Sequence, residues 1–124
     1  MRRNPYEKYL SKEDRMQNRV MAYLKTNYAD VLSIHVPNEG KRSPFERFKF
    51  KYLGGVSGVP DILIFKKNRS YSGLAIELKV GYNKPTQNQK DVLERLKMAG
   101  WCAEWSNSYD HVIELIDKYF RDEV

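Results

Sequence analysis

The stretch VPDILIF at residues 59–65, followed by GLAIELKV at residues 73–80, decides the fold of this chain. Both segments are rich in aliphatic and β-branched residues, and the polar segment KKNRSYS at 66–72 between them has the composition of a turn. The pattern therefore predicts two strands that pair as a β-hairpin.

The register of this hairpin follows from the position of the turn. Pairing Asp61 with Glu77 centres the turn on residue 69, and pairing Asp61 with Lys79 centres it on residue 70, so both pairings fit the polar segment. Because side chains alternate between the two faces of a strand, Asp61, Glu77 and Lys79 share one face at one end of the hairpin. The other face receives the aliphatic residues Ile62, Ile64, Leu74, Ile76 and Leu78.

Two carboxylates that face each other in this way destabilise a sheet unless a positive charge lies between them. A hard divalent cation prefers oxygen ligands, and the ammonium group of Lys79 would lie beside it. The hairpin therefore predicts a metal site at Asp61 and Glu77.

The motif formed by Pro60-Asp61, Glu77-Leu78-Lys79 and Gln89 resembles the signature of the PD-(D/E)XK nucleases. The surrounding chain is similar to the stand-alone VRR-Nuc (virus-type replication-repair nuclease) domains. A P-D pair with E-x-K occurs often by chance, whereas the ordered set at these spacings is specific. The resemblance covers most of the chain, and its further matching positions are Glu13, Gln17, HVPNEG at 35–40, Leu96 and Gly100.

The resemblance implies a nuclease site that depends on Mg²⁺ or Mn²⁺. Asp61 and Glu77 would bind the metal together with the backbone carbonyl of Leu78, and Glu13 would act directly or through water. Lys79 would orient the attacking water or stabilise the pentacovalent transition state. One Asp and one Glu on the hairpin leave open whether one or two metal ions act.

Two helix starts contain further candidate site residues. SKED at 11–14 is a capping box that predicts a helix to about Tyr28. The negative charge of Glu13 would also be stabilised by the positive N-terminal end of this helix. TQNQ at 86–89 is a second capping box that predicts a helix to Ala99, and capping alone would explain Gln89. The resemblance favours a role at the metal site for both residues, with Gln89 positioning water or phosphate.

Residues 37–60 form a connection longer than loops in compact domains usually are, which indicates a functional or mobile segment. Between residues 41 and 52 cations interleave with aromatic residues, so the segment offers phosphate-neutralising groups beside rings that can stack on unpaired bases. The alternative is that the rings pack inward beneath a solvated basic face. The predicted DNA-contacting residues are Asn38, Lys41, Arg42, Arg47, Lys49 and Lys51.

Length and composition fit this interpretation. The 124 residues suit one domain over 1–124, with 1–10 as a flexible arm, and the net charge of +6 favours a polyanionic partner, although a merely basic surface gives the same charge. One cysteine excludes an internal disulfide. With no membrane-spanning apolar run and no signal peptide, a cytoplasmic location is expected, which the resemblance places in a bacterial or phage-infected cell.

The predicted element order is helix, strand, long loop, strand, strand, helix, strand, helix. This order indicates an α/β domain with a mixed sheet flanked by helices. The resemblance adds the αβββαβ core of the PD-(D/E)XK, restriction-endonuclease-like fold. The outer elements are a strand at 31–36, a strand at 101–105 and a last helix through 112–120, whose apolar side chains either cover the sheet or build a dimer contact.

The sequence therefore predicts a divalent-metal-dependent DNA endonuclease. The resemblance implies a homodimer that cuts branched DNA such as four-way junctions, because a two-fold dimer presents one site to each of two symmetry-related strands. A non-catalytic DNA-binding module that uses the basic segment is the alternative, and a structural or adaptor domain is a third possibility. Neither of these needs a carboxylate pair beside a lysine.

Overall fold

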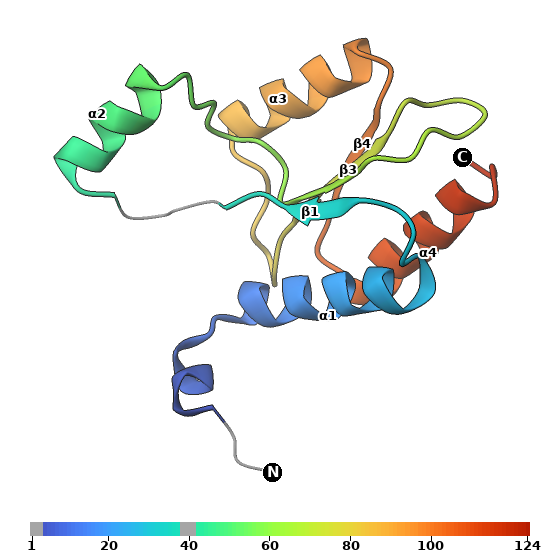
Figure 1. The fold of residues 1–124 in the computed structure, drawn as a ribbon, viewed down its shortest axis with the longest axis horizontal. Helices are drawn as coiled ribbons and strands as arrows, with labels where there is room; N and C mark the ends of the chain where they lie inside the picture. The colour runs from blue at the N-terminus through green and yellow to red at the C-terminus, as the bar shows by residue number, and fades with distance from the viewer. Residues whose placement is uncertain (1–3, 38–41) are drawn as a thin grey trace.

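The computed structural model describes residues 4–37 and 42–124. A β-sheet lies between helices α1 and α4 on one face and helix α3 on the other (Figure 1). In chain order the elements are η1 (Pro5–Tyr9), α1 (Lys12–Asn27), β1 (Ser33–His35), α2 (Pro44–Tyr52), β2 (Ile62–Ile64), β3 (Leu74–Leu78), α3 (Gln87–Met98), β4 (Cys102–Ser106) and α4 (Tyr109–Phe120).

The sheet is mixed and follows the order β1-β2-β3-β4. β1 and β3 each pair with β2 in the antiparallel sense, and β4 pairs with β3 in the parallel sense. Ile62 faces Ile76 across the hairpin, which brings Asp61 opposite Glu77 and excludes the alternative pairing with Lys79. The predicted α/β class, the αβββαβ order and the first of the two predicted registers are confirmed.

The two faces of the hairpin have different partners. The five aliphatic residues predicted for one face are fully buried beneath α1 and α4. On the opposite face the small side chains of Ala75 and Ala103 let α3 approach, and Leu93 is buried against them. Because packing holds the hairpin from both sides, the residues at its end have fixed positions.

Helix α4 belongs to the core, so the first of the two alternatives for its apolar side chains, covering the sheet rather than building a dimer contact, is the one observed. Tyr119 is fully buried, and its hydroxyl donates a hydrogen bond to the Lys66 carbonyl at 2.6 Å. The Phe120 ring stacks on Tyr28 of the α1 C-cap, with ring centroids 3.9 Å apart. The apolar stripe of α4 faces the sheet, because this contact removes the apolar surfaces of both the helix and the sheet from water.

The segment 37–60, predicted as a long loop, contains helix α2. Ser43 Oγ accepts a hydrogen bond from the Glu46 backbone N–H, the Glu46 carboxylate accepts one from Ser43 N, and Pro44 occupies the first turn. This S-x-x-E capping box is the same local signal that predicts α1 and α3. No residue of α2 is buried, and the helix projects from the body of the molecule (Figure 1).

The N-terminal arm also has more order than predicted. Pro5–Tyr9 form a 3-10 helix, and the Asn4 side chain caps it by accepting a hydrogen bond from Tyr6 N at 2.9 Å. The Arg15 guanidinium donates to the Glu7 carbonyl at 2.7 Å and so ties this turn to α1. Over the described ranges, none of the helices combines the length and the apolar character needed to cross a membrane.

Candidate active site

The carboxylates of Asp61 and Glu77 lie at one end of the hairpin. Asp61 immediately precedes β2 and Glu77 lies in β3, and they are only 3% and 1% exposed. Asp61 Oδ2 accepts a hydrogen bond from the Leu78 backbone N–H at 2.7 Å. The neighbouring strand therefore fixes the orientation of Asp61.

The two oxygens of Glu77 have different surroundings. Oε2 accepts a hydrogen bond from Gln89 Nε2 at 3.1 Å and lies 3.4 Å from the Lys79 ammonium. Oε1 is buried and has no hydrogen-bond partner. Buried acceptors are nearly always satisfied, because leaving one unpaired costs about 1–3 kcal/mol. Oε1 is therefore the position at which a cation or a proton is needed.

The electrostatics of Glu77 agree with this need. Burial, and then the negative charge of Asp61, raise the pKa of Glu77 to about 8, while Lys79 opposes the rise. At neutral pH Glu77 therefore keeps a proton unless a cation replaces it. Two buried carboxylates with one orphaned oxygen fit a hard divalent ion, and Mg²⁺ is commonly bound through one or two carboxylates with several waters.

The side-chain amide of Gln89 makes hydrogen bonds in two directions. Its Oε1 accepts a hydrogen bond from Thr86 N at 2.9 Å, which closes the capping box of α3. Its Nε2 donates to Glu77 at 3.1 Å. The start of α3 is therefore joined directly to the carboxylate pair.

Glu13 lies near Asp61 but does not complete a ligand cluster. Burial, followed by the charge of Asp61, raises the pKa of Glu13. In the described part of the chain, no three His, Cys, Asp or Glu side chains converge to hold a metal ion. A cavity of about 250 Å³ at this place is lined by Glu13, Asp14, Gln17, His35, Val36, Pro37 and Asp61.

Comparison with known proteins assigns this chain to a family. Residues 3–109 match the family model described as the VRR-NUC domain. The chain belongs to the VRR-NUC family. This is a family of nucleases, so the predicted resemblance is confirmed. No curated protein sequence matches the chain.

Two solved structures are similar to this VRR-NUC chain. One, titled "VRR_NUC domain protein", is 32% identical, covers 90% of each chain and superposes with a TM-score of 0.77. Another, titled "VRR_NUC domain", is 23% identical, covers 84% of this chain and 97% of its own, and has a TM-score of 0.53. The first supports family and fold, and the second supports the fold alone.

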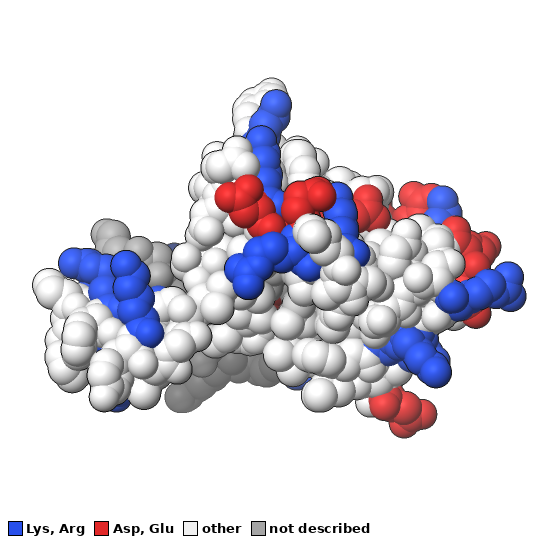
Figure 2. Space-filling view, turned by 90° about the horizontal axis from the view of Figure 1, so that it is seen from above, with Lys and Arg blue, Asp and Glu red and all other residues white. Residues whose placement is uncertain are grey.

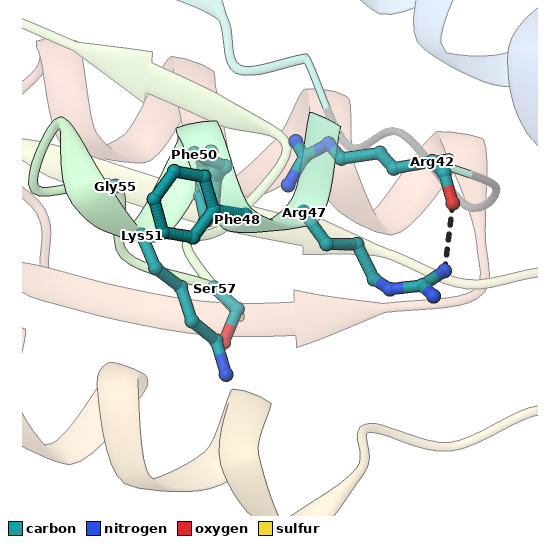
Figure 3. A pocket seen from close by; sticks show the side chains of 7 residues that line it. All are labelled: Arg42, Arg47, Phe48, Phe50, Lys51, Gly55 and Ser57. Carbon is teal, nitrogen blue, oxygen red and sulfur yellow. Dashed lines mark hydrogen bonds between the residues drawn. The ribbon is translucent and has the colours of Figure 1, made fainter. Parts of the chain in front are cut away.

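Those cations predicted to contact DNA that fall within the described residues lie on or beside α2 of this VRR-NUC domain. The Arg47 guanidinium donates to the Arg42 carbonyl at 2.7 Å, and the Arg42 guanidinium lies 3.9 Å from the centre of the Phe50 ring (Figure 3). Lys51 lines the same pocket as both arginines. The remaining three predictions are Lys49, an exposed residue of α2, and Asn38 and Lys41, which fall outside the described residues.

Three residues near the site were not predicted to take part in it. His35 lines the cavity with Asp61, and the residue after it, Val36, donates its N–H to the Asp61 carbonyl at 2.7 Å. Trp105 pairs with Glu77 across the parallel strands. Asn88 Nδ2 donates to the Ser57 hydroxyl at 2.9 Å. These contacts join distant segments, and only the spacing of HVPN before the hairpin gave any sequence signal.

Proposed function

We propose that this VRR-NUC domain is a divalent-metal-dependent DNA endonuclease that hydrolyses phosphodiester bonds. The observation that carries the proposal is the buried pair of Asp61 and Glu77, with Glu77 Oε1 left unpartnered. Without a cation such a pair costs stability, since burial and like charge both oppose ionisation. A bound cation would offset this loss of stability, so the buried carboxylate pair supports a cation-dependent activity.

Each side chain has a role in this proposal. Asp61 and Glu77, with the backbone carbonyl of Leu78, hold Mg²⁺ or Mn²⁺. When bound, the ion lowers the pKa of a water molecule and neutralises charge on the phosphate. The Lys79 ammonium, 3.4 Å from Glu77, supplies positive charge beside the reacting phosphate, where it orients the nucleophile or stabilises the transition state.

The two remaining residues act around this centre. The Gln89 amide is held between Thr86 and Glu77, and it positions water or phosphate at the site. Glu13 acts through water from the cavity that it shares with Asp61. Burial raises the pKa of Glu13, so its carboxyl group is suited to exchange a proton with that water.

The proposed substrate is branched DNA such as a four-way junction, cut by a homodimer. The support is the net charge of +6, the exposed cations of α2 and the resemblance to stand-alone VRR-Nuc domains. One site cuts one strand, and a two-fold dimer places two sites on symmetry-related strands. Since the apolar face of α4 is buried in the core, the dimer surface lies elsewhere.

Cleavage assays test the chemistry. Labelled four-way junctions and matched linear duplexes are incubated with the protein in Mg²⁺, Mn²⁺ or EDTA, with Asp61→Asn as the matched inactive control. We expect products with either metal, and none with EDTA or with the variant. Equal DNA binding with and without Mg²⁺, combined with no cleavage under any condition, would instead identify a non-catalytic DNA-binding module.

A separate pair of measurements tests assembly and substrate shape. Sedimentation gives the oligomeric state at the assay concentration, and competition between junction and duplex gives the preference. We expect a dimer that nicks junctions symmetrically and prefers them to linear DNA. A monomer, or equal cleavage of both DNAs, would reject this part of the proposal and leave the metal chemistry standing.

A further inference from the structure

Helix α2 carries aromatic residues with two different orientations. Phe50 packs against its own chain, because a Cβ added at Gly55 would lie only 2.4 Å from the Phe50 ring. The Arg42 guanidinium covers this ring at 3.9 Å from its centre (Figure 3). Phe50 therefore anchors the helix to the segment that follows it.

The other three rings form one exposed face. Phe45, Phe48 and Tyr52 are 68%, 62% and 78% exposed. Their spacing of three and four residues places them on the same side of the helix. The rings of Phe48 and Tyr52 are already stacked with each other, with centroids 5.7 Å apart and planes inclined by 27°. Exposed aromatic surface of this kind indicates a binding site.

The charge around these rings identifies the occupant. Residues 42–57 contain four cations, Arg42, Arg47, Lys49 and Lys51, and one carboxylate, Glu46, so their net charge is +3 out of +6 for the chain. Figure 2 shows this end of the molecule with Lys and Arg side chains and no acidic side chain on the face drawn. A two-fold contact with a second copy would bring like charges together, whereas a polyanion complements them.

The helix is also tied to the active site. The Ser57 hydroxyl accepts a hydrogen bond from Asn88 Nδ2 at 2.9 Å, and a Cβ added at Gly58 would lie 2.8 Å from the same nitrogen. Asn88 adjoins Gln89, whose amide contacts Glu77. The segment that follows α2 is therefore joined to the carboxylate pair through the start of α3.

We propose that Phe45, Phe48 and Tyr52 form a stacking surface for unpaired bases of the DNA substrate. This inference rests on the proposed function and adds to it the feature of the DNA that is recognised. The cations contact phosphates, which are the same in paired and unpaired DNA, while aromatic faces bind bases that are not stacked in a duplex. Linear duplex exposes no unpaired bases, so a surface of this kind selects branched DNA in which bases next to the branch point are unpaired.

The test compares two DNAs with identical phosphates. Each has a short single-stranded gap, with normal bases in one and abasic sugar-phosphates in the other, and binding to the full chain is measured in EDTA. We expect wild type to prefer the gap with bases by roughly 5- to 150-fold for each stacked base. Phe48→Leu and the double variant with Tyr52→Leu should reduce this preference stepwise toward one.

Two variants serve as controls. Phe65→Leu removes a half-exposed ring at the far end of β2 and should keep the wild-type preference. Lys49→Gln should weaken binding to both DNAs equally. Since α2 has no buried residue, the Leu variants are expected to fold, and circular dichroism checks this.

Several outcomes would overturn the inference. The first two are equal binding of both DNAs by wild type and an undiminished preference for the gap with bases in the folded double variant. The other two are loss of dimerisation in that variant and ring-dependent binding to anionic lipid vesicles without a base preference. Cleavage in Mg²⁺ is scored separately. A protein that cuts no DNA but keeps the preference fails only the proposed function, and one that cuts DNA without a preference fails only this inference.

Discussion

Helices α2 and α3 begin in the same way and have different fates. Ser43 with Glu46 and Thr86 with Gln89 are complete capping boxes. α3 buries Val92 and Leu93 against the sheet, and its cap reaches Glu77, whereas α2 buries no residue. Local sequence is therefore sufficient to start a helix, but packing decides whether that helix can hold a reactive group in place.

This difference matches two different physical demands. A hydrolytic site needs its groups held to within about half an ångström, which requires a packed scaffold. Contact with a long, variable polyanion tolerates an element of low local stability. The hairpin end and α2 should accordingly respond to substitution in different ways.

The largest expected effect is loss of cleavage at the hairpin end. Asp61→Ala, Glu77→Ala and Lys79→Ala should each reduce the rate by roughly 100- to 1,000-fold, as removal of one electrostatic catalytic group commonly does. The fold should persist, because these groups lie at the end of the hairpin. Cleavage rates, with circular dichroism of each purified variant, measure this. Near-normal turnover by a folded variant would remove that residue from the site.

The second effect is on stability and pH. The folded pKa of Glu77, about 8, exceeds its ordinary value of 4.5, so its stabilising contribution is present below pH 4.5 and is lost as pH rises through 8. Glu77→Gln cannot ionise and should stabilise the metal-free protein at pH 9 by on the order of 1–3 kcal/mol, with little gain at pH 4. Denaturant unfolding in EDTA measures both. An equal gain at the two pH values would show that ionisation is not the cause.

A smaller effect is expected from charge on α2. Changing Lys49 and Lys51 to Ala should flatten the dependence of log affinity on log salt by about one unit for each phosphate that the protein no longer neutralises. Turnover at saturating DNA should change less than affinity, because the carboxylate pair is untouched. Binding titrations between low and moderate salt provide the slope. If the slope stays at its wild-type value, neither lysine touches phosphate.

The smallest effect compares the two caps directly. Thr86→Ala should lower the global free energy of unfolding by about 1 kcal/mol, since α3 is part of the core. Ser43→Ala removes the corresponding capping hydrogen bond from α2. It should leave the global free energy of unfolding unchanged while increasing the rate of hydrogen exchange in α2. An equal decrease in the global free energy of unfolding in both variants would mean that α2 unfolds together with the sheet and its packed helices.

Much of the fold could be predicted because its signals are local. Alternation and the polar turn predict the hairpin, and two capping boxes predict α1 and α3 close to their observed bounds. The register that brings Asp61 opposite Glu77 follows from the same local pattern. Helix α2 is absent from the predicted elements although SPFE at 43–46 carries the same cap, because the rings at 45, 48, 50 and 52 do not all follow one helical face.

What could not be predicted depends on contacts between distant segments. Trp105 lies across from Glu77 only because β4 adds to the sheet in parallel beside β3. The bond from Asn88 to Ser57 joins the first turn of α3 to the loop after α2, and their separation in sequence gives no hint of contact. The burial of Tyr119 likewise depends on which way the last helix turns its apolar face.

The amide of Gln89 has one further consequence. Its oxygen accepts a hydrogen bond from Thr86 N and its nitrogen donates one to Glu77, so a single amide group joins the first turn of α3 to the carboxylate. Ionisation of Glu77 converts the bond from Gln89 into a charge-assisted one, which is shorter and stronger. The backbone protons at the start of α3 should then exchange more slowly with solvent. Hydrogen exchange at the start of α3 should therefore report the charge state of the buried Glu77 carboxylate.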